Sequence, residues 1–129
     1  MLLSRLSKSA LRRTPESLLG MPMRQYVALS YVGEPGGLSQ QQLTEILMMD
    51  ANNVVLLLNE LERDGLVHRE RDPADRRRHL VQITDAGIAV LDRAQAARGT
   101  VDEEVLGALT SVEREELHRL LGKALGEAH

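Results

Sequence analysis

Cysteine is absent from the 129 residues of this chain, and aromatic residues make up only 2% of it. The lack of cysteine excludes a disulfide, a thiol redox sensor and a zinc or iron–sulfur site with cysteine ligands. The scarcity of aromatic residues leaves a core of leucine, valine, isoleucine, alanine and methionine. With 43% hydrophobic and 27% charged residues, the composition is that of a globular protein, and the length indicates one domain with a sizeable core.

Long hydrophobic runs are also missing. No apolar run approaches the roughly 20 residues that are needed to span a bilayer. The start of the sequence lacks the apolar segment and cleavage site of a secretory signal. We therefore expect a cytoplasmic protein that does not enter a membrane.

Residue clusters that would indicate a metal site or a catalytic centre are equally scarce. The histidines lack the paired spacing of metal ligands, although they can still meet in space or across a dimer. They are His68, His79, His118 and His129. The stretch from Gly33 to Gly37 lacks the lysine and the serine or threonine that complete a phosphate-binding P-loop. No carboxylate pair is placed beside a histidine by the sequence. We expect no cofactor, no metal and no enzymatic activity.

The charge is unevenly distributed along the chain. A formal net charge of −3 argues against a protein that coats nucleic acid through bulk charge. Basic residues gather between Arg63 and Arg78, whereas acidic residues dominate from Asp102 to Glu127. Any contact with nucleic acid should therefore be focused on one face.

The first part of the chain predicts two helices. Apolar residues recur at helical spacing from Leu2 to Arg13. Thr14 precedes Pro15, and a proline disfavours the helical conformation in the residue before it, so this helix should stop there. A second helix is predicted at 22–32, and the glycine-rich loop at 33–37 ends it.

The next segment predicts two short helices in helix-turn-helix spacing. Ser39 and Gln42 form a capping-box pattern that opens the first of them. Asp50 is placed to cap the second helix after a tight connection, and Gly65 supplies the left-handed residue that closes it. The residues expected to point inward from the two helices are Leu43, Ile46, Leu47, Val54, Leu57, Leu58 and Leu61.

A β-hairpin is predicted directly after the second of these helices. The strands are 66–68 and 80–83, the turn is 72–75, and three arginines lie at or just beyond its tip. They are Arg76, Arg77 and Arg78. Two short helices followed by a hairpin make a winged helix-turn-helix, a mainly α fold with a small β-hairpin wing. An arginine run can also be a solvated loop, and its position after the two helices favours a DNA contact.

Five residues of the second short helix are not required by its apolar stripe. They are Asn52, Asn53, Val55, Leu56 and Asn59. Adjacent asparagines near a helix start can hydrogen-bond to base edges or phosphate, or can simply favour the helix start. Val55 and Leu56 either contact thymine methyl groups or pack under the wing.

The segment 38–84 resembles the MarR (multiple antibiotic resistance regulator) family of winged helix-turn-helix transcriptional regulators. The resemblance rests mainly on the wing motif from Asp72 to Arg77, followed by a strand that ends in Ile83-Thr84. It implies a homodimer, usually a repressor, that binds a pseudo-palindromic operator on double-stranded DNA. It also implies a small-molecule effector pocket beside a layer of dimerisation helices.

Specific residues match the motif of that family. The resemblance implies that Asp75 braces the wing tip and that Arg77 enters the minor groove, with Arg76 and Arg78 on phosphate or as substitutes for Arg77. Ser39 and Gln40 match the start of the first DNA-binding helix. The recognition helix departs from the pattern. Many members have Ser-Thr followed, after two residues, by a basic residue, whereas this chain has Asn52-Asn53 and then Val55-Leu56. The operator sequence therefore does not follow from the resemblance.

The flanking helices indicate dimerisation. Asp85 is expected to cap a helix that runs from 86 to about 98, or on to 109, and Thr110 begins a last capped helix. The leucines outside the winged lobe exceed what that lobe can cover, and they are Leu2, Leu3, Leu6, Leu117, Leu120, Leu121 and Leu125. An intramolecular three-helix cap is the alternative. We predict one MarR-like domain over 1–129, with dimerisation helices at 1–20 and 100–129, the DNA-binding lobe at 22–84 and a connecting helix at 85–99.

Two further interpretations stay open. Arg24, Tyr26, Ser30 and Tyr31 can line a pocket for a small amphipathic or anionic effector, or can be packing residues of the core. The winged fold can also serve as a protein-interaction module that does not bind DNA specifically, and the arginine tip argues against that use.

Overall fold

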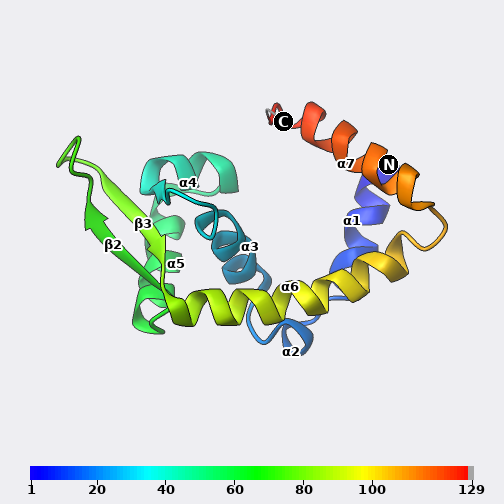
Figure 1. The fold of residues 1–129 in the computed structure, drawn as a ribbon, viewed down its shortest axis with the longest axis horizontal. Coiled ribbons are helices and arrows are strands. Elements are labelled where there is room, and N and C mark those ends of the chain that lie inside the picture. Colours follow the sequence, from blue (N-terminus) through cyan, green and yellow to red (C-terminus); the bar gives the residue numbers. More distant parts are fainter. Residues whose placement is uncertain (128–129) are drawn as a thin grey trace. The chain divides into compact units, whose positions relative to one another are not determined.

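The computed structural model describes residues 1–127, so His129 lies outside it. The chain is mainly helical with one small antiparallel sheet (Figure 1). In chain order the elements are α1 (Leu2–Arg12), α2 (Glu16–Leu19), α3 (Met23–Val32), β1 (Leu38–Ser39), α4 (Gln40–Leu47), α5 (Ala51–Arg63), β2 (Val67–Arg71), β3 (His79–Ile83), α6 (Asp85–Val105) and α7 (Ser111–Ala124). No helix among the described residues combines the length and the apolar character that a membrane span requires.

The chain divides into two compact units, which we call the central unit and the terminal unit. The central unit comprises Thr14–Arg98. The terminal unit comprises Met1–Arg13 and the chain from Gly99 onward. The central unit contains the winged helix-turn-helix, and the terminal unit contains α1 and α7.

The helix-turn-helix forms for the reasons that the sequence indicated. At the start of α4 the Ser39 hydroxyl accepts from the backbone N–H of Gln42 at 3.0 Å, and the Gln42 side chain accepts from the backbone N–H of Ser39 at 2.9 Å. This is the predicted capping box. Gly65 has a φ of +75°, the left-handed conformation that ends α5. The residues that pack between the helices and the sheet are buried, and the core includes Ala28, Leu29, Val32, Leu43, Val54, Leu57, Leu58, Leu61, Val67 and Val81.

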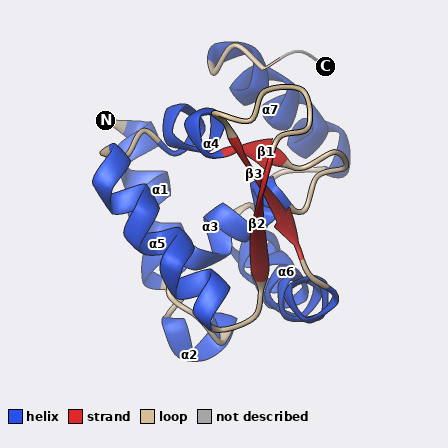
Figure 2. Ribbon diagram, turned by 90° about the vertical axis from the view of Figure 1, so that its left-hand side faces the viewer, coloured by secondary structure: helices blue, strands red, loops and turns tan. Residues whose placement is uncertain are grey.

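The sheet has the strand order β1-β3-β2, with both pairs antiparallel. Figure 2 shows β3 between the other two strands. Strand β2 is longer than predicted and runs to Arg71, which pairs with His79. Strand β1 was not predicted, because a segment of two residues, paired as Leu38 with Val81 and Ser39 with Leu80, has no alternating pattern to reveal it.

Three expectations about individual side chains were wrong or incomplete. Ile46 was expected to point inward, but it is 40% exposed. Only a narrow face of the short helix α4 packs against the core, and Ile46 lies at its edge. Asp85 was expected to cap α6, but the Thr84 hydroxyl does so by accepting from the backbone N–H of Gly87 at 3.0 Å. Asp50 lies at the N-cap of α5 as predicted, without a side-chain cap hydrogen bond.

The terminal unit has little core of its own. Helix α1 contains no buried residue, and the only buried residue of α7 is Gly122. The predicted cap of α7 is confirmed, because Thr110 and Glu113 form a capping box. Large apolar side chains of this unit remain at the surface, and they include Leu2, Leu3, Leu11, Val112, Leu120, Leu121 and Leu125.

Candidate nucleic-acid interface

The tip of the β2–β3 hairpin is held by its own hydrogen bonds. The Asp72 backbone N–H donates to the Arg78 carbonyl at 2.9 Å, and the Arg78 N–H donates to the Asp75 carbonyl at 2.9 Å. The Asp72 carboxylate accepts from the backbone N–H of Ala74 at 2.8 Å. Short aspartate side chains that accept from backbone groups two residues on are typical of tight turns. The tip is therefore a defined turn that carries exposed arginines.

Asp75 and Arg77 interact at this tip. The Asp75 Oδ1 atom accepts from the backbone N–H of Arg77 at 3.1 Å and lies 3.4 Å from its Nε. The Arg77 side chain is nevertheless 93% exposed, so the carboxylate orients the backbone and the Nε of Arg77 while the side chain stays open to solvent. Arg76 and Arg78 are exposed as well, and the Arg76 carbonyl accepts from Arg71 at 3.0 Å. The arrangement gives the wing an ordered cluster of positive charge.

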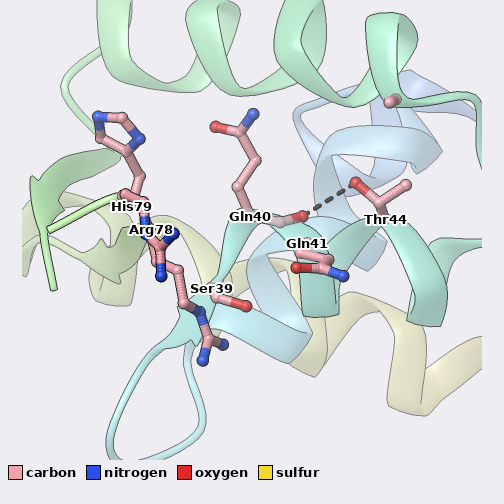
Figure 3. A pocket seen from close by; sticks show the side chains of 8 residues that line it. Ser39, Gln40, Gln41, Thr44, Arg78 and His79 are labelled. Atoms are coloured by element: carbon pink, nitrogen blue, oxygen red, sulfur yellow. Dashed lines mark hydrogen bonds between the residues drawn. The ribbon is translucent and has the colours of Figure 1, made fainter. Parts of the chain in front are cut away.

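The wing and the starts of α4 and α5 line one open cavity of about 330 Å³, which we call the interface cavity. Figure 3 shows several of its side chains, with Thr44 donating to the Gln40 carbonyl at 2.9 Å. The lining residues are Ser39, Gln40, Gln41, Thr44, Ala51, Arg77, Arg78 and His79. Two arginines and the N-terminal ends of two helices favour an anion here, and no carboxylate is among the lining residues.

Sequence alone singled out Ser39, Gln40, Arg77 and Arg78 from this set but missed the other four lining residues. Those are Gln41, Thr44, Ala51 and His79. Thr44 lies one turn after Gln40, so helical spacing was a usable signal for it. His79 enters the site only because β3 begins beside α4, which is a long-range contact that no local pattern predicts.

The predicted residues of α5 differ in their surroundings. Asn52, Asn53 and Leu56 are exposed, whereas Val55 is half-buried. Asn59 is exposed but its carboxamide oxygen accepts from Arg69 of β2 at 2.6 Å. Ser39 is buried, and its hydroxyl caps α4. Among these residues, Ser39 shapes the site while the exposed side chains of α5 remain available to a ligand.

Ion pairs join α5 to its neighbours. Glu62 accepts from Arg69, which lowers the pKa of the Glu62 carboxyl below its ordinary value of 4.5. A hydrogen bond from Gln25, and after it the contact with Arg24, lowers the pKa of Glu60 in the same way. The two carboxylates therefore attach α5 to strand β2 and to helix α3.

The residues expected to bind an effector lie on α3. Arg24 pairs with Glu60 at 3.2 Å, and the Ser30 hydroxyl donates to the Val27 carbonyl at 2.7 Å. Tyr26 and Tyr31 are partly buried and pack against the core. Their role in binding an effector stays a prediction. Within residues 1–127 there is no group of three or more side chains suited to hold a metal ion.

The chain is similar to known transcriptional regulators over most of its length. The sequence pattern of the MarR family matches residues 19–78. The transcriptional regulator HosA of Escherichia coli O111:H- is 35% identical over 101 residues, which cover 78% of this chain and 75% of that protein.

Solved structures agree with this similarity. CouR from Rhodococcus jostii RHA1, solved with p-coumaroyl-CoA, is 27% identical with a TM-score of 0.82, covering 95% of this chain and 88% of the other. A mutant of MarR from Escherichia coli, solved with operator DNA, is 26% identical with a TM-score of 0.78, covering 96% of this chain and 91% of the other. Both are similar to the present chain across both of its compact units.

Proposed function

The chain belongs to the MarR family of transcriptional regulators, and we propose that it is a homodimeric repressor that binds a pseudo-palindromic DNA operator. The observation that carries the proposal is the interface cavity. There the wing and the starts of both helices of the helix-turn-helix present arginines, amides and hydroxyls to one space. These are the groups that bind phosphate oxygens and position a protein on a duplex.

Helix α5 and the wing are proposed to contact different grooves of the DNA because their shapes differ. Helix α5 presents Asn52, Asn53 and Leu56 on an exposed face, and a helix of this size enters the major groove. The wing presents the guanidinium of Arg77, which suits a narrow minor groove because its negative potential is enhanced there. Arg78 and Gln40 would then contact the backbone between the two grooves.

Dimerisation is supported by the exposed apolar surface of the terminal unit. Leu2, Leu3, Leu6 and Leu117 line a groove of about 560 Å³ together with Arg5. A second apolar groove of about 500 Å³ shares Leu117 and includes Leu109, Val112 and Leu120. Contiguous apolar surface of this kind marks an interaction site, and a second copy of the chain is the occupant we propose. Two copies double the number of base pairs contacted.

We also propose that a small molecule relieves the repression. One similar protein was solved with operator DNA and another with p-coumaroyl-CoA. An effector releases DNA if it binds the form of the dimer that does not fit the operator more tightly than the form that does. We infer an effector of this kind, and the candidate residues on α3 stay a prediction.

The test is selection of bound duplexes from a random pool, followed by titration of the selected duplex at several salt concentrations. A two-fold symmetric site and a steep loss of affinity with salt are expected, because Arg77 and its neighbours would displace counterions from phosphates. Selection of no sequence at any salt concentration would instead favour the winged-helix protein-interaction module.

A further inference from the structure

The exposed face of α5 carries one side chain that the wing holds in a fixed orientation. Asn52, Leu56, Asn59 and Arg63 recur at helical spacing on the face opposite the buried residues of α5, and all four are exposed. Asn59 also contacts strand β2, through Arg69. A residue of the wing therefore acts directly on a residue of the proposed recognition face.

Arg69 determines which atoms Asn59 presents. The Arg69 Nη2 atom lies 2.6 Å from the Asn59 carboxamide oxygen. A guanidinium has donors only, so the amide atom that faces it must be the oxygen. The Nδ2 group then keeps its two N–H donors, and no hydrogen bond from them is formed within residues 1–127. Asn59 is thus a donor toward solvent.

Glu62 holds Arg69 in this position. Its Oε1 lies 3.2 Å from Arg69 Nη2, and its Oε2 accepts from the Arg69 backbone N–H at 3.1 Å. The Arg69 side chain is only 21% exposed. Glu62 follows Asn59 by three residues on α5, so both lie where one guanidinium can reach them. Charge-assisted hydrogen bonds to Glu62 and to Asn59 leave the Arg69 guanidinium little freedom to reorient.

We infer that Arg69 is a positioning residue that makes Asn59 select a base with a keto oxygen in the major groove, guanine O6 or thymine O4. The inference rests on the proposed function. An unrestrained asparagine favours adenine, because it accepts from N6 and donates to N7. Here Arg69 holds the Asn59 oxygen toward strand β2 and takes one of its two lone pairs. The N6 donor of adenine then no longer faces that oxygen, and adenine keeps only the N7 contact, whereas a keto oxygen still meets the Nδ2 donors.

The test is selection from a random duplex pool with the full-length protein and two variants, Asn59→Ala and Arg69→Met. The unsubstituted chain should enrich guanine or thymine at one position of each half-site, and the enriched base identifies which of the two is bound. The preference should be about tenfold in affinity, and Asn59→Ala should remove it at that position alone. Arg69→Met releases the Asn59 oxygen and should move the preference at the same position toward adenine.

The controls separate positioning from folding. Thermal unfolding checks each variant, and Glu62→Gln gives a second way to loosen Arg69 without removing it. Arg119→Met removes an arginine that is paired with Glu116 on α7 and should leave every base preference unchanged. If Arg69→Met and Glu62→Gln both keep the original preference, the positioning role is overturned. If Asn59→Ala changes no position, base selection by Asn59 is overturned, while enrichment of a site by the unsubstituted chain still upholds the proposed function.

Discussion

At the scale of single residues, Arg77 combines two properties that a DNA contact needs. The Asp75 carboxylate orients the Arg77 backbone by accepting from its N–H, and the Arg77 side chain is 93% exposed. An oriented side chain loses less conformational entropy when it binds. The neighbouring Arg76 and Arg78 are exposed too, so they provide positive charge around one preferred contact.

The first prediction concerns this residue. Arg77→Ala should weaken binding to the selected operator by about 1 to 3 kcal/mol, because the proposed contact with the minor groove would be lost while the core stays unchanged. Fluorescence anisotropy with a labelled duplex measures the change. Arg93→Ala removes an equally charged exposed residue from α6 and serves as the matched control. Equal affinities for the two variants would exclude the wing from the mechanism.

The second prediction concerns Glu62, whose pKa lies below its ordinary value because of Arg69. A group whose pKa is lowered by folding stabilises the folded state above its unfolded value, and the contribution is lost as the pH falls. Glu62→Gln should therefore lower the urea midpoint at pH 7, and the difference should shrink as the pH drops below 4.5. Urea unfolding at several pH values measures it.

The matched control for this prediction is Glu70→Gln on strand β2, next to Arg69 in the sequence. Glu70 is exposed, so its replacement should leave the urea midpoint nearly unchanged at pH 7. A pH-independent difference between Glu62→Gln and the unsubstituted chain would contradict the role of the ionised carboxylate.

At the scale of elements, the junction between the wing and α6 depends on a close approach. A Cβ atom built on Gly87 would lie 2.1 Å from the Leu66 carbonyl oxygen and 2.7 Å from Ile83 Cγ1. The Thr84 hydroxyl accepts from the Gly87 N–H, and the backbone N–H of Thr84 donates to the Leu66 carbonyl at 3.0 Å. Glycine therefore lets α6 begin directly against the end of the helix-turn-helix.

The third prediction follows from this contact. Gly87→Ala should destabilise the protein by about 1 to 3 kcal/mol, because the backbone must shift to admit the methyl group. Gly99→Ala in the same helix meets nothing within 4 Å and should stabilise α6 by about 0.5 to 1 kcal/mol. Urea unfolding of both variants gives the comparison, and a neutral Gly87→Ala would refute the close approach.

The turn between α4 and α5 shows a second backbone requirement. Met48 has a φ of +53°. This is the left-handed region of backbone conformation, which residues other than glycine and asparagine rarely adopt. It ends α4 in the tight connection to α5, and its side chain is 86% exposed. The packing of the two helices therefore imposes this conformation, since the Met48 side chain contributes little contact that would favour it.

At the scale of the whole molecule, the two compact units differ in how well they bury their apolar residues. The central unit contains a continuous core from Leu19 to Ala94. The terminal unit leaves Leu2, Leu120 and Leu125 exposed, at 78%, 47% and 68%. This contrast is expected if the terminal unit completes its core only when a second copy binds.

The fourth prediction tests that assembly. Leu120→Glu should convert the dimer to a monomer and lower operator affinity at least tenfold, because a charge is placed in apolar surface that the partner would bury. Light scattering measures the mass, and the labelled duplex measures affinity. Ile88→Glu on α6 changes a side chain of similar exposure, 45% against 47%, in the central unit, and should leave the dimer intact. A dimeric Leu120→Glu variant would exclude this surface.

The sequence by itself determined the local elements of this protein. The capping box at Ser39, the left-handed Gly65 and the buried stripe of α5 follow from helical periodicity and backbone chemistry, which act over a few residues. The wing followed from a turn motif flanked by two short apolar runs, and the family from the same motif. The functions of the individual interface residues stay predictions.

Only the tertiary structure decided which of these elements meet. Strand β1 forms because Leu38 pairs with Val81 of strand β3. His79 and Gln40 line the same cavity. Arg69 reaches Asn59 from another element and sets the orientation of its amide. Such contacts join residues that are distant along the chain. Their partners are set by packing, which no local periodicity encodes.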